Sequence, residues 1–372
     1  MQRLRVLITN IWMSGFGGSE AVTRDIALGL LRRGHFPTVY TPELGPSGEE
    51  LRRRGVPVID DLTRILVRPD VIHAHHVTCA AEAIARFPYT PCINGLHAWV
   101  FGVEAPVVFP QVRRWLAVDE AVRERALHAP GVDPDRVRML FNAVDLTRHQ
   151  PRPPLPERPR RAVMFGKAAY LEPVLAAACA AHGVELVKLF GQPDPERILA
   201  EADIVFASAR AALEALCTGC AVVVCDTRGF AGLVTPDNFS AWRAKNFGVQ
   251  LLQAPVNVAN VGAAIAAYDP QASASLREMA RKDADLETYL DQLLALYAEV
   301  IAEFRGLPFN QSGYELALSA FLRDVLPRHV VDPFVGRAAD HAGLQARCLA
   351  LEGEVEFLKK SLAEALARNP AD

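Results

Sequence analysis

Long apolar stretches are missing from this sequence. No segment approaches the ~18 apolar residues that a membrane-spanning helix requires, so we expect no such helix. The N-terminus also lacks the pattern of a secretory signal, because the apolar run after Arg5 is short and is followed by polar residues and glycine. We therefore expect a cytoplasmic protein, either free or attached peripherally to the inner face of a membrane.

An excess of one charge is also missing. The 40 Lys and Arg residues nearly balance the 43 Asp and Glu residues, for a net charge of −3. This balance argues against a nucleic-acid partner. Local basic runs occur at 52–54 and 158–161. We interpret them as solvated surface or linker, and a basic patch for an acidic membrane face is the alternative.

Cysteine occurs in a number and spacing that do not suit a disulfide framework. The seven cysteines are odd in number and lie scattered through apolar segments, which is typical of reduced, buried thiols. Cys217 and Cys220 have the CxxC spacing, but no second pair accompanies them. A redox or metal role is therefore disfavoured there.

A regular alternation of strands and helices fills most of the chain. Short apolar strands alternate with amphipathic helices, such as the one predicted at 20–33, and this order predicts parallel sheets covered on both faces. Five prolines within residues 150–159 interrupt the alternation and indicate an interdomain linker. The same rhythm then resumes and ends in a long helix at 286–304. The chain therefore predicts an α/β fold of two Rossmann-like domains, 1–150 and 151–305, whose sheets face a cleft.

The last part of the sequence has a different periodicity. Apolar residues recur every seven positions in two series offset by four: Leu344, Leu351, Leu358 and Ala365, and Cys348, Val355 and Leu362. This seam predicts a coiled coil at 341–369, after a helical extension at 306–340, and hence a homo-oligomer formed through the C-terminal helix. Gly353 inside the seam weakens the coil, and a terminal helix packed on its own chain is the alternative.

The first candidate ligand site is a glycine-rich turn at 14–19, where Gly17 and Gly18 precede a predicted helix. It matches neither the GxGxxG nor the P-loop pattern. Glycine permits close approach of the backbone to a ligand, and the free N–H groups of a helix N-terminus bind phosphate. A tight turn without a ligand would have the same sequence features.

A second turn begins the helix predicted at 211–217. Ser208 lies near its N-cap, and Arg210 lies in its first turn, where a cation opposes the helix dipole unless an anion is bound. We therefore interpret Arg210 as part of a diphosphate clamp. Glu214 lies on an otherwise apolar face, so we expect it to accept hydrogen bonds from ribose hydroxyls or backbone N–H groups. A solvated helix glutamate is the alternative.

Histidines gather at predicted strand ends in the first half, at positions 73, 75, 76 and 97. Because ligands of α/β sheets bind at the carboxyl ends of the strands, we expect these side chains in the cleft. His73, His75 and His76 are metal ligands by type, but no carboxylate is near them in sequence, so a metal site is disfavoured. His97 lies in a polar loop, where an imidazole that only packs is the alternative.

Several segments, in this order, resemble family 4 retaining glycosyltransferases of the GT-B fold. They are GGSE at 17–20 with ALGLLRRGH at 27–35, DVIHAH at 70–75, LH at 96–97, NAVD at 142–145, FGK at 165–167 and LEALCTGCAVV at 213–223. The resemblance covers about residues 1–305. It implies a transferase that moves a sugar from a UDP- or GDP-linked donor to a cell-surface glycan, lipid or protein, with retained configuration.

The resemblance also implies roles for residues of this chain. Glu214 would hold the donor ribose, and His97 would lie near the reacting sugar, so these two are the expected catalytic residues. The other donor-binding residues would be Gly17, Gly18, Gly166, Lys167, Ser208 and Arg210. The acceptor-side residues would be His73, His75, His76 and Asn142. No metal or cofactor is expected, because basic groups and a helix dipole carry the charge of the leaving group.

The chain departs from the family pattern at charged positions. Phe206 stands where the family has the first Glu of its E-x7-E pair, and 168–171 lack the Lys that follows the family's Gly-Arg pair. These missing groups leave a non-catalytic GT-B-like scaffold as the alternative function, with an epimerase of the same fold as a third.

Overall fold

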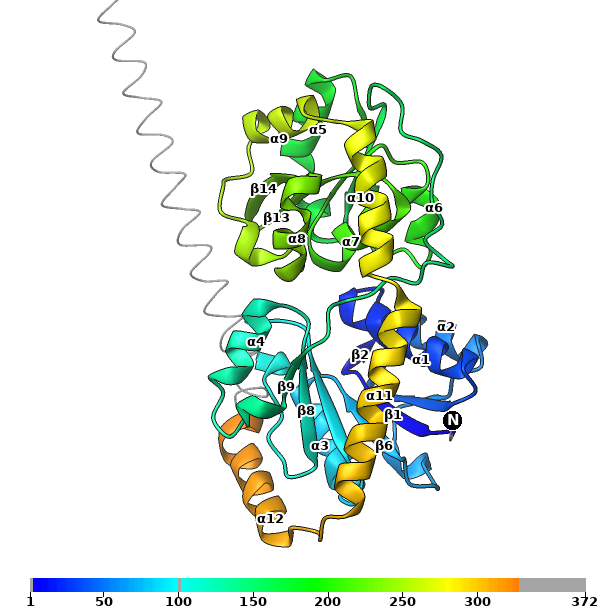
Figure 1. The fold of residues 1–372 in the computed structure, drawn as a ribbon, viewed down its shortest axis with the longest axis vertical. Coiled ribbons are helices and arrows are strands. Elements are labelled where there is room, and N and C mark those ends of the chain that lie inside the picture. The colour runs from blue at the N-terminus through cyan, green and yellow to red at the C-terminus, as the bar shows by residue number, and fades with distance from the viewer. Residues whose placement is uncertain (1–2, 100–101, 328–372) are drawn as a thin grey trace, which may run out of the picture. The chain divides into compact units, whose positions relative to one another are not determined.

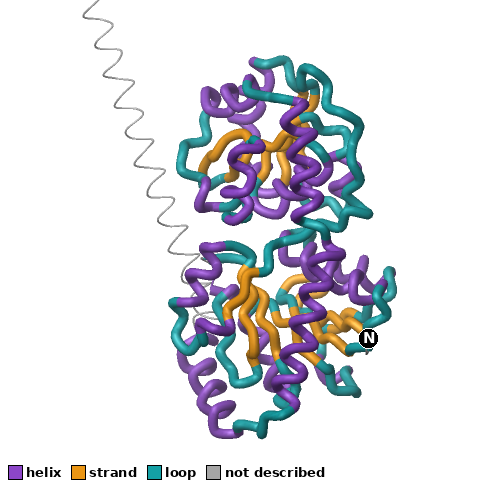
Figure 2. The backbone as a smooth tube through the Cα atoms, viewed as in Figure 1, coloured by secondary structure: helices purple, strands orange, loops and turns teal. Residues whose placement is uncertain are grey.

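Figure 1 shows a computed structural model of the chain, which describes residues 3–99 and 102–327. The chain divides into two compact units, Met1–Tyr314 and Glu315–Asp372. The first unit holds two large sheets, and helices flank each of them (Figure 2). We call the part built on the seven-stranded sheet the first lobe and the part built on the five-stranded sheet the second lobe.

The sheet of the first lobe is wholly parallel, in the order β5-β3-β1-β6-β7-β8-β9. Its strands are β1 (Arg5–Thr9), β3 (Phe36–Tyr40), β5 (Val58–Ile59), β6 (Val71–Ala74), β7 (Cys92–Leu96), β8 (Val112–Ala117) and β9 (Val137–Met139). The three strands β6, β7 and β8 are buried along their whole length, as expected for parallel strands covered on both faces. Two short strands, β2 (Trp12–Met13) and β4 (Glu43–Leu44), pair with each other.

The helices between these strands are α1 (Gly18–Arg32), α2 (Pro46–Arg53), α3 (Val77–Arg86) and α4 (Glu120–Leu127). The alternation predicted from the sequence is thus confirmed in this lobe. Helix α1 is buried from Val22 through Leu30. It ends next to Gly34, whose φ of 78° lies in the left-handed region that glycine tolerates best.

The second sheet has the order β11-β10-β12-β13-β14. Its strands are β10 (Arg161–Phe165), β11 (Glu185–Leu189), β12 (Ile204–Ala207), β13 (Ala221–Asp226) and β14 (Gly229–Leu233). The last pair is antiparallel, which corrects the expectation of a wholly parallel sheet. Asp226 pairs with Gly229 across a two-residue connection, and a connection that short joins only antiparallel strands.

The helices of the second lobe are α5 (Glu172–Ala181), α6 (Pro195–Leu199), α7 (Ala209–Thr218), α8 (Pro236–Ala244), α9 (Val258–Ala266) and α10 (Pro270–Asp283). The six cysteines in the described part of the chain are buried and unpaired. Burial raises the pKa of the Cys217 and Cys220 thiols to about 12. Both thiols therefore stay protonated and unreactive at neutral pH.

The long helix α11 (Leu286–Arg305) packs against the first lobe rather than the second, which differs from the domain boundary expected at 305. Its apolar face joins the core of the first sheet through Leu293, Tyr297 and Val300. Gly29 of α1 lets the two helices approach closely, since a Cβ atom there would lie 2.3 Å from Leu290. An apolar pattern identifies such a helix but does not say which of two apolar sheets it covers.

The chain crosses between the lobes twice, and the two crossings are hydrogen-bonded to each other. Val144, on the outgoing segment, forms a parallel bridge with Asp285, on the returning one. The Val144 amide donates to the Ala284 carbonyl at 2.8 Å, and the Leu286 amide donates to the Val144 carbonyl at 3.2 Å. Residues 145–284 therefore form one continuous insertion between two parts of the first lobe.

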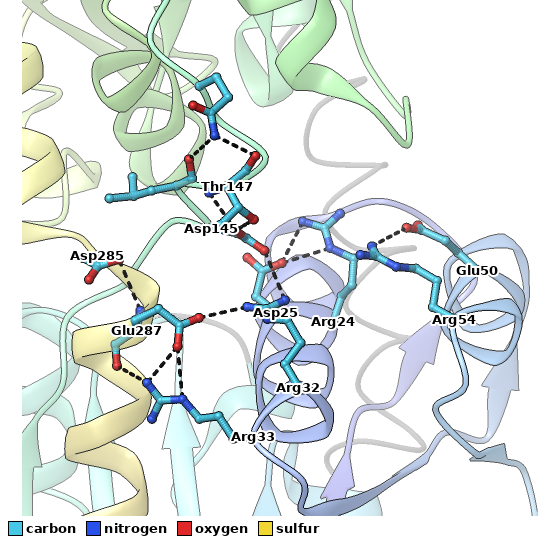
Figure 3. Close-up of polar contacts among 12 residues, drawn as sticks. Arg24, Asp25, Arg32, Arg33, Glu50, Arg54, Asp145, Thr147, Asp285 and Glu287 are labelled. Atoms are coloured by element: carbon cyan, nitrogen blue, oxygen red, sulfur yellow. Dashed lines mark hydrogen bonds and ion pairs between the residues drawn. The ribbon is translucent and has the colours of Figure 1, made fainter.

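Charged side chains hold α1 to the start of α11 near these crossings (Figure 3). Arg33 donates to Glu287 and, at 2.7 Å, to Asp291. Arg32 donates to Glu287 at 3.1 Å and contacts Asp145 at 3.5 Å. Apart from the buried Asp145, these groups are partly exposed, so each pair adds little stability alone, but together they fix where α11 begins.

The prolines at 151–159 lie in an irregular segment, but the chain crosses between the lobes before it, at Val144. It is anchored rather than free, because Arg152 donates to Asp203 at 2.9 Å and to the Ala202 carbonyl at 2.6 Å. It therefore belongs to the second lobe.

After α11, the described residues continue through α12 (Gln311–Ala320) and a π-helical turn at Phe321–Val325. Within the predicted extension at 306–340, residues 306–310 are irregular and residues 311–327 are helical. The predicted coiled coil at 341–369 lies outside the described residues. None of the helices in the described ranges is both long and apolar enough to cross a membrane.

Candidate active site

The glycine-rich turn leads into α1 as predicted. Gly17 is the N-cap, and no side chain caps the first helical N–H groups. The Glu20 carboxylate folds back over the turn, where it accepts a hydrogen bond from Ser19 at 3.0 Å. A Cβ atom at Gly18 would meet nothing within 4 Å, so packing does not require glycine there and the space beside it is open.

The start of α7 in the second lobe is also uncapped. Ser208 is its N-cap, but the hydroxyl donates to Asp226 at 2.6 Å and forms no capping bond. Ala209 has a φ of 54°, which is unusual for a residue other than glycine. The following N–H groups thus have no side-chain partner, and the positive end of the helix dipole lies there. Such a terminus is suited to an anion.

Two cations lie close to this terminus. Arg228 is held by Asp226, to which its backbone amide and its Nε donate at 2.9 and 3.0 Å. Lys167 follows Gly166 at the end of β10, and within the described ranges its ammonium forms no hydrogen bond or ion pair. Partial burial and the charge of Arg228 lower the pKa of Lys167, whereas Asp226 opposes this shift. Among the described residues, Asp226 pairs with Arg228, and the charge of Lys167 has no ion-pair partner.

Arg210 has a different environment, because it is buried and surrounded by acceptors. Its Nε donates to Glu214 at 2.8 Å, one terminal nitrogen donates to the Ala143 carbonyl at 2.9 Å, and the other contacts Asp25 of α1. Asp25 also pairs with Arg24 at 3.0 Å (Figure 3). Burial alone would raise the pKa of Asp25, but Arg24 and Arg210 lower it to about 2. The Asp25 carboxylate is therefore ionised throughout the neutral range.

The four histidines meet at the carboxyl edge of the first sheet. The Nδ1 atom of His75 lies 2.7 Å from Nε2 of His97, and the rings of His73 and His75 are 4.6 Å apart. His73 Nδ1 lies 2.7 Å from the Tyr297 hydroxyl of α11. Gly95 permits this arrangement, since a Cβ atom there would lie 2.9 Å from the His75 ring.

Burial favours the neutral form of His73, His75 and His97. Burial and the charge of His97 lower the pKa of His73 to about 3, and burial lowers the pKa of His75 well below its usual value. Burial also lowers the pKa of His97, although Glu104 opposes the shift. The site therefore offers neutral hydrogen-bonding groups near pH 7.

Hydrogen bonds indicate which ring nitrogens carry protons. His76 Nδ1 accepts from the Ile11 amide at 3.2 Å, so its proton lies on Nε2, which faces Glu104 at 3.3 Å. His75 Nε2 is buried without a partner, and buried donors without partners are rarer than buried acceptors without partners. His75 is therefore assigned a proton on Nδ1, which donates to His97 Nε2. His97 then carries its own proton on Nδ1.

Comparison with known proteins decides the class of this site. Residues 16–148 match the model of Glycosyltransferase Family 4. The chain is a glycosyltransferase. The resemblance seen in the sequence is confirmed over this range. A search of curated proteins gave no match.

Solved structures share the fold of this glycosyltransferase. A glycosyltransferase from Rickettsia africae ESF-5 has 12% sequence identity and a TM-score of 0.55, and the match covers 81% of this chain and 99% of that one. Anabaena Alr3699/HepE, solved in complex with UDP and glucose, has 14% identity and a TM-score of 0.57, with 80% and 100% covered. The predicted GT-B fold is confirmed by these likenesses.

The glycosyltransferase brings together most of the residues that the sequence singled out. Gly166, Lys167 and Ser208 lie at neighbouring strand ends of the second sheet, and the four histidines form one cluster. Arg210 differs from expectation, because the anions beside it are Asp25 and Glu214 of the protein itself. Asn142 is buried, and its side-chain amide donates to Asn246 at 3.2 Å, so it joins the segment between the lobes to the second lobe.

Sequence reasoning missed several residues of this glycosyltransferase site. Asp25 shares a helix face with Val22 and Leu28, so the argument applied to Glu214 would have found it. Glu104, which accepts from the His97 amide at 3.1 Å, and Tyr297 had no comparable signal. In the described part of the chain, no group of three or more His, Cys, Asp or Glu residues has the arrangement of a metal site.

Proposed function

We propose that this glycosyltransferase takes its sugar from a UDP- or GDP-linked donor and transfers it, with retained configuration, to a cell-surface glycan, lipid or protein. In this proposal the second lobe binds the nucleotide and the first lobe binds the acceptor. Neither a metal nor a cofactor takes part.

One observation carries the donor proposal: Lys167 and Arg228 lie together beside the uncapped start of α7, and Lys167 has no ion-pair partner among the described residues. Asp226 pairs with Arg228, so one of the two positive charges is left without a partner there, and like charges repel. A diphosphate would balance the charge of Lys167 and the helix dipole at once. The same groups would stabilise the diphosphate as it leaves the sugar, when its negative charge increases.

His97 is the proposed group beside the reacting sugar. With its Nε2 atom accepting from His75, its Nδ1–H is left to donate to a sugar hydroxyl. Neutral imidazole suits this task, because it orients a hydroxyl without repelling the positive charge that develops on the sugar ring. His73, His75, His76 and Asn142 are the proposed acceptor-side residues, with the histidines supporting His97.

Glu214 is the proposed ribose ligand and second catalytic residue. Arg210 fixes the direction of its carboxylate through the 2.8 Å contact from Nε. A carboxylate held in this way accepts hydrogen bonds from the ribose diol at a low entropic cost. Arg210 thereby contributes to donor binding by orienting Glu214.

Calorimetric titration of the full chain with UDP and GDP tests this proposal. Lys167→Ala should weaken binding of the preferred nucleotide about tenfold, the effect of one charged hydrogen bond. Lys188→Ala is the matched control, since Lys188 already pairs with Glu172 at 3.2 Å, and its affinity should be unchanged. Absence of binding by the unaltered chain would refute the donor proposal.

The stereochemistry, the location and the assembly are parts of the same proposal. Proton NMR of the first product formed would show a retained anomeric configuration, and inversion would contradict it. We place the enzyme in the cytoplasm, free or at the inner membrane face. We also propose a homo-oligomer through 341–369, which Leu351→Asp should dissociate; an unchanged mass by light scattering would count against it.

A further inference from the structure

Arg210 divides its hydrogen-bond donors between the two lobes. Its Nε atom donates to Glu214, one turn further along α7, at 2.8 Å, and one terminal nitrogen contacts Asp25 of α1 in the first lobe. The other terminal nitrogen donates at 2.9 Å to the carbonyl of Ala143, which precedes the first crossing between the lobes. Acceptors from three separate segments therefore fix the plane of the guanidinium group.

Asp25 is itself held in place from the first lobe. Arg24 Nε donates to Oδ1 of Asp25 at 3.0 Å (Figure 3), whereas Arg210 contacts Oδ2. Each oxygen of the carboxylate thus has its own arginine. Because all three side chains are buried, little water competes for these contacts, and hydrogen bonds between ionised groups are the strongest of their kind. Asp25 is therefore a firm anchor for one terminal nitrogen of Arg210.

The Glu214 carboxylate is engaged through one oxygen only. Its Oε1 atom accepts from Arg210, whereas in the described part of the chain Oε2 accepts no hydrogen bond and is not sealed from solvent. An arginine beside a carboxylate commonly binds both oxygens through two parallel N–H bonds. Arg210 does not do so here, since the terminal nitrogen that contacts Asp25 is held away from Glu214. The contact with Asp25 therefore leaves Oε2 of Glu214 available to a ligand.

A purely structural role accounts less well for this cluster. Buried ion pairs are often no more stabilising than apolar side chains of similar size, because the charges lose their hydration. The chain of contacts here runs from Arg24 through Asp25 and Arg210 and ends at the open oxygen of Glu214. Such an arrangement is expected where one acceptor is being oriented for a ligand.

We infer that Asp25 is a positioning residue for the donor site: by holding a terminal nitrogen of Arg210, it keeps Oε2 of Glu214 open to the ribose diol. This inference rests on the proposed function, because it concerns how Glu214 reaches the ribose. It gives the first lobe a part in recognising a nucleotide that the second lobe binds. Since the contact serves the ribose hydroxyls, Asp25 should favour ribonucleotides over deoxyribonucleotides.

The test compares each ribonucleotide with its 2′-deoxy form. Affinities of the full chain for UDP, GDP, 2′-deoxy-UDP and 2′-deoxy-GDP are measured by calorimetry. The unaltered chain should bind the ribonucleotide about tenfold more tightly than its deoxy form, the effect of one hydrogen bond to a charged group. Asp25→Ala should bring this ratio close to one, because Arg210 then turns to both oxygens of Glu214. Asp25→Asn keeps an oxygen for Arg210 and should retain part of the ratio.

Further variants separate positioning from stability. Arg24→Gln removes the other arginine of Asp25 but leaves its contact with Arg210, so the ratio of affinities should be unchanged. Urea denaturation records the stability of each variant, and a loss of stability alone weakens binding of both nucleotide forms equally. In a Glu214→Ala background, Asp25→Ala should not change the ratio further, because its effect acts through that carboxylate.

The outcomes distinguish this inference from the function on which it rests. An undiminished ratio in folded Asp25→Ala or Asp25→Asn protein would overturn the positioning role and leave Glu214 as the ribose ligand. The same fall of the ratio in Arg24→Gln would also overturn it, because the contact with Arg210 would then not be the cause. A ratio of one in the unaltered chain would overturn the ribose contact of Glu214 together with this inference. Failure of the unaltered chain to bind any nucleotide would overturn the donor proposal as a whole.

Discussion

The carboxyl edges of the two sheets differ in how their polar groups are satisfied. At the first sheet, His75 bonds to His97, His73 bonds to Tyr297 and His76 contacts Glu104, and burial lowers the pKa of His73 to about 3. At the second sheet, Lys167 lies beside Arg228 and has no ion-pair partner among the described residues. The first edge thus presents polar groups that bond to one another, and the second presents a cation that the described residues leave unpaired. One fold thus provides two kinds of polar surface through the residues at its strand ends.

Among the substitutions that test this comparison, the largest loss of stability is expected at Arg210. Its charge balances two buried carboxylates between the two edges. Arg210→Ala leaves Glu214 buried without its cation and leaves Asp25 with Arg24 alone, so we expect a loss of roughly 3–5 kcal/mol in the free energy of unfolding. Urea denaturation measures it.

The exposed pair of Lys188 and Glu172 provides the control for Arg210. Lys188→Ala should change the free energy of unfolding by less than about 1 kcal/mol. A similarly small loss for Arg210→Ala would mean that water reaches the Asp25 and Glu214 carboxylates.

As the pH falls, the protein should first lose the stability contributed by the histidines at the carboxyl edge of the first sheet. The pKa of His73 lies near 3 in the folded protein, below its usual value of 6.5, so only the unfolded chain binds the proton between these values. The stability that His73 contributes is complete above pH 6.5 and is lost as the pH falls toward 3, on the order of 4 kcal/mol. Asp25 extends the loss of stability below pH 4, because its pKa in the folded protein, about 2, also lies below its usual value.

Denaturation curves across this pH range measure the effect. His73→Gln should flatten the decline between pH 6.5 and 4, whereas His128→Gln, at an exposed site on α4, should leave its slope as it is. The same slope in both variants would assign the decline to other groups.

A smaller effect on stability is expected from Gly95→Ala, which tests the packing of the histidine cluster. Gly95→Ala puts a Cβ atom 2.9 Å from the His75 ring and 3.2 Å from His73, so the rings must shift. We expect a loss of about 1–3 kcal/mol in the free energy of unfolding and a lower kcat. Gly306→Ala, where nothing lies within 4 Å, is the neutral control. Unchanged kcat in Gly95→Ala would mean that the alignment of His75 with His97 does not matter for transfer.

The alternation of strands and helices could be predicted from the sequence, because the residues of each strand or helix specify it locally. The helices predicted at 20–33 and 286–304 correspond to α1 and α11, each within two residues at both ends. Strand β14 was not predicted, since its sequence Gly-Phe-Ala-Gly-Leu includes two glycines and shows no alternation of apolar and polar residues. Its antiparallel direction follows from the short turn before it.

The candidate site could be predicted from the sequence only in part, because the side chains that contact one another there come from distant segments of the chain. The position of His97 at a strand end indicated the edge it would occupy, but its bond to His75 depends on Gly95 leaving room. The contact of Arg210 with Asp25 joins residues 185 positions apart. No local periodicity encodes such a pair, so the sequence predicted an anion beside Arg210 but not its source.

The paired crossings at Val144 and Asp285 have a consequence for how this enzyme can change over time. The chain leaves the first lobe before residue 145 and returns to it after residue 284, at neighbouring, hydrogen-bonded points. The whole second lobe is therefore one continuous segment whose two ends are adjacent. Under the proposed function, exchange of that one segment, by recombination or by engineering, would replace the donor specificity while the first lobe, including α11, keeps its native connections.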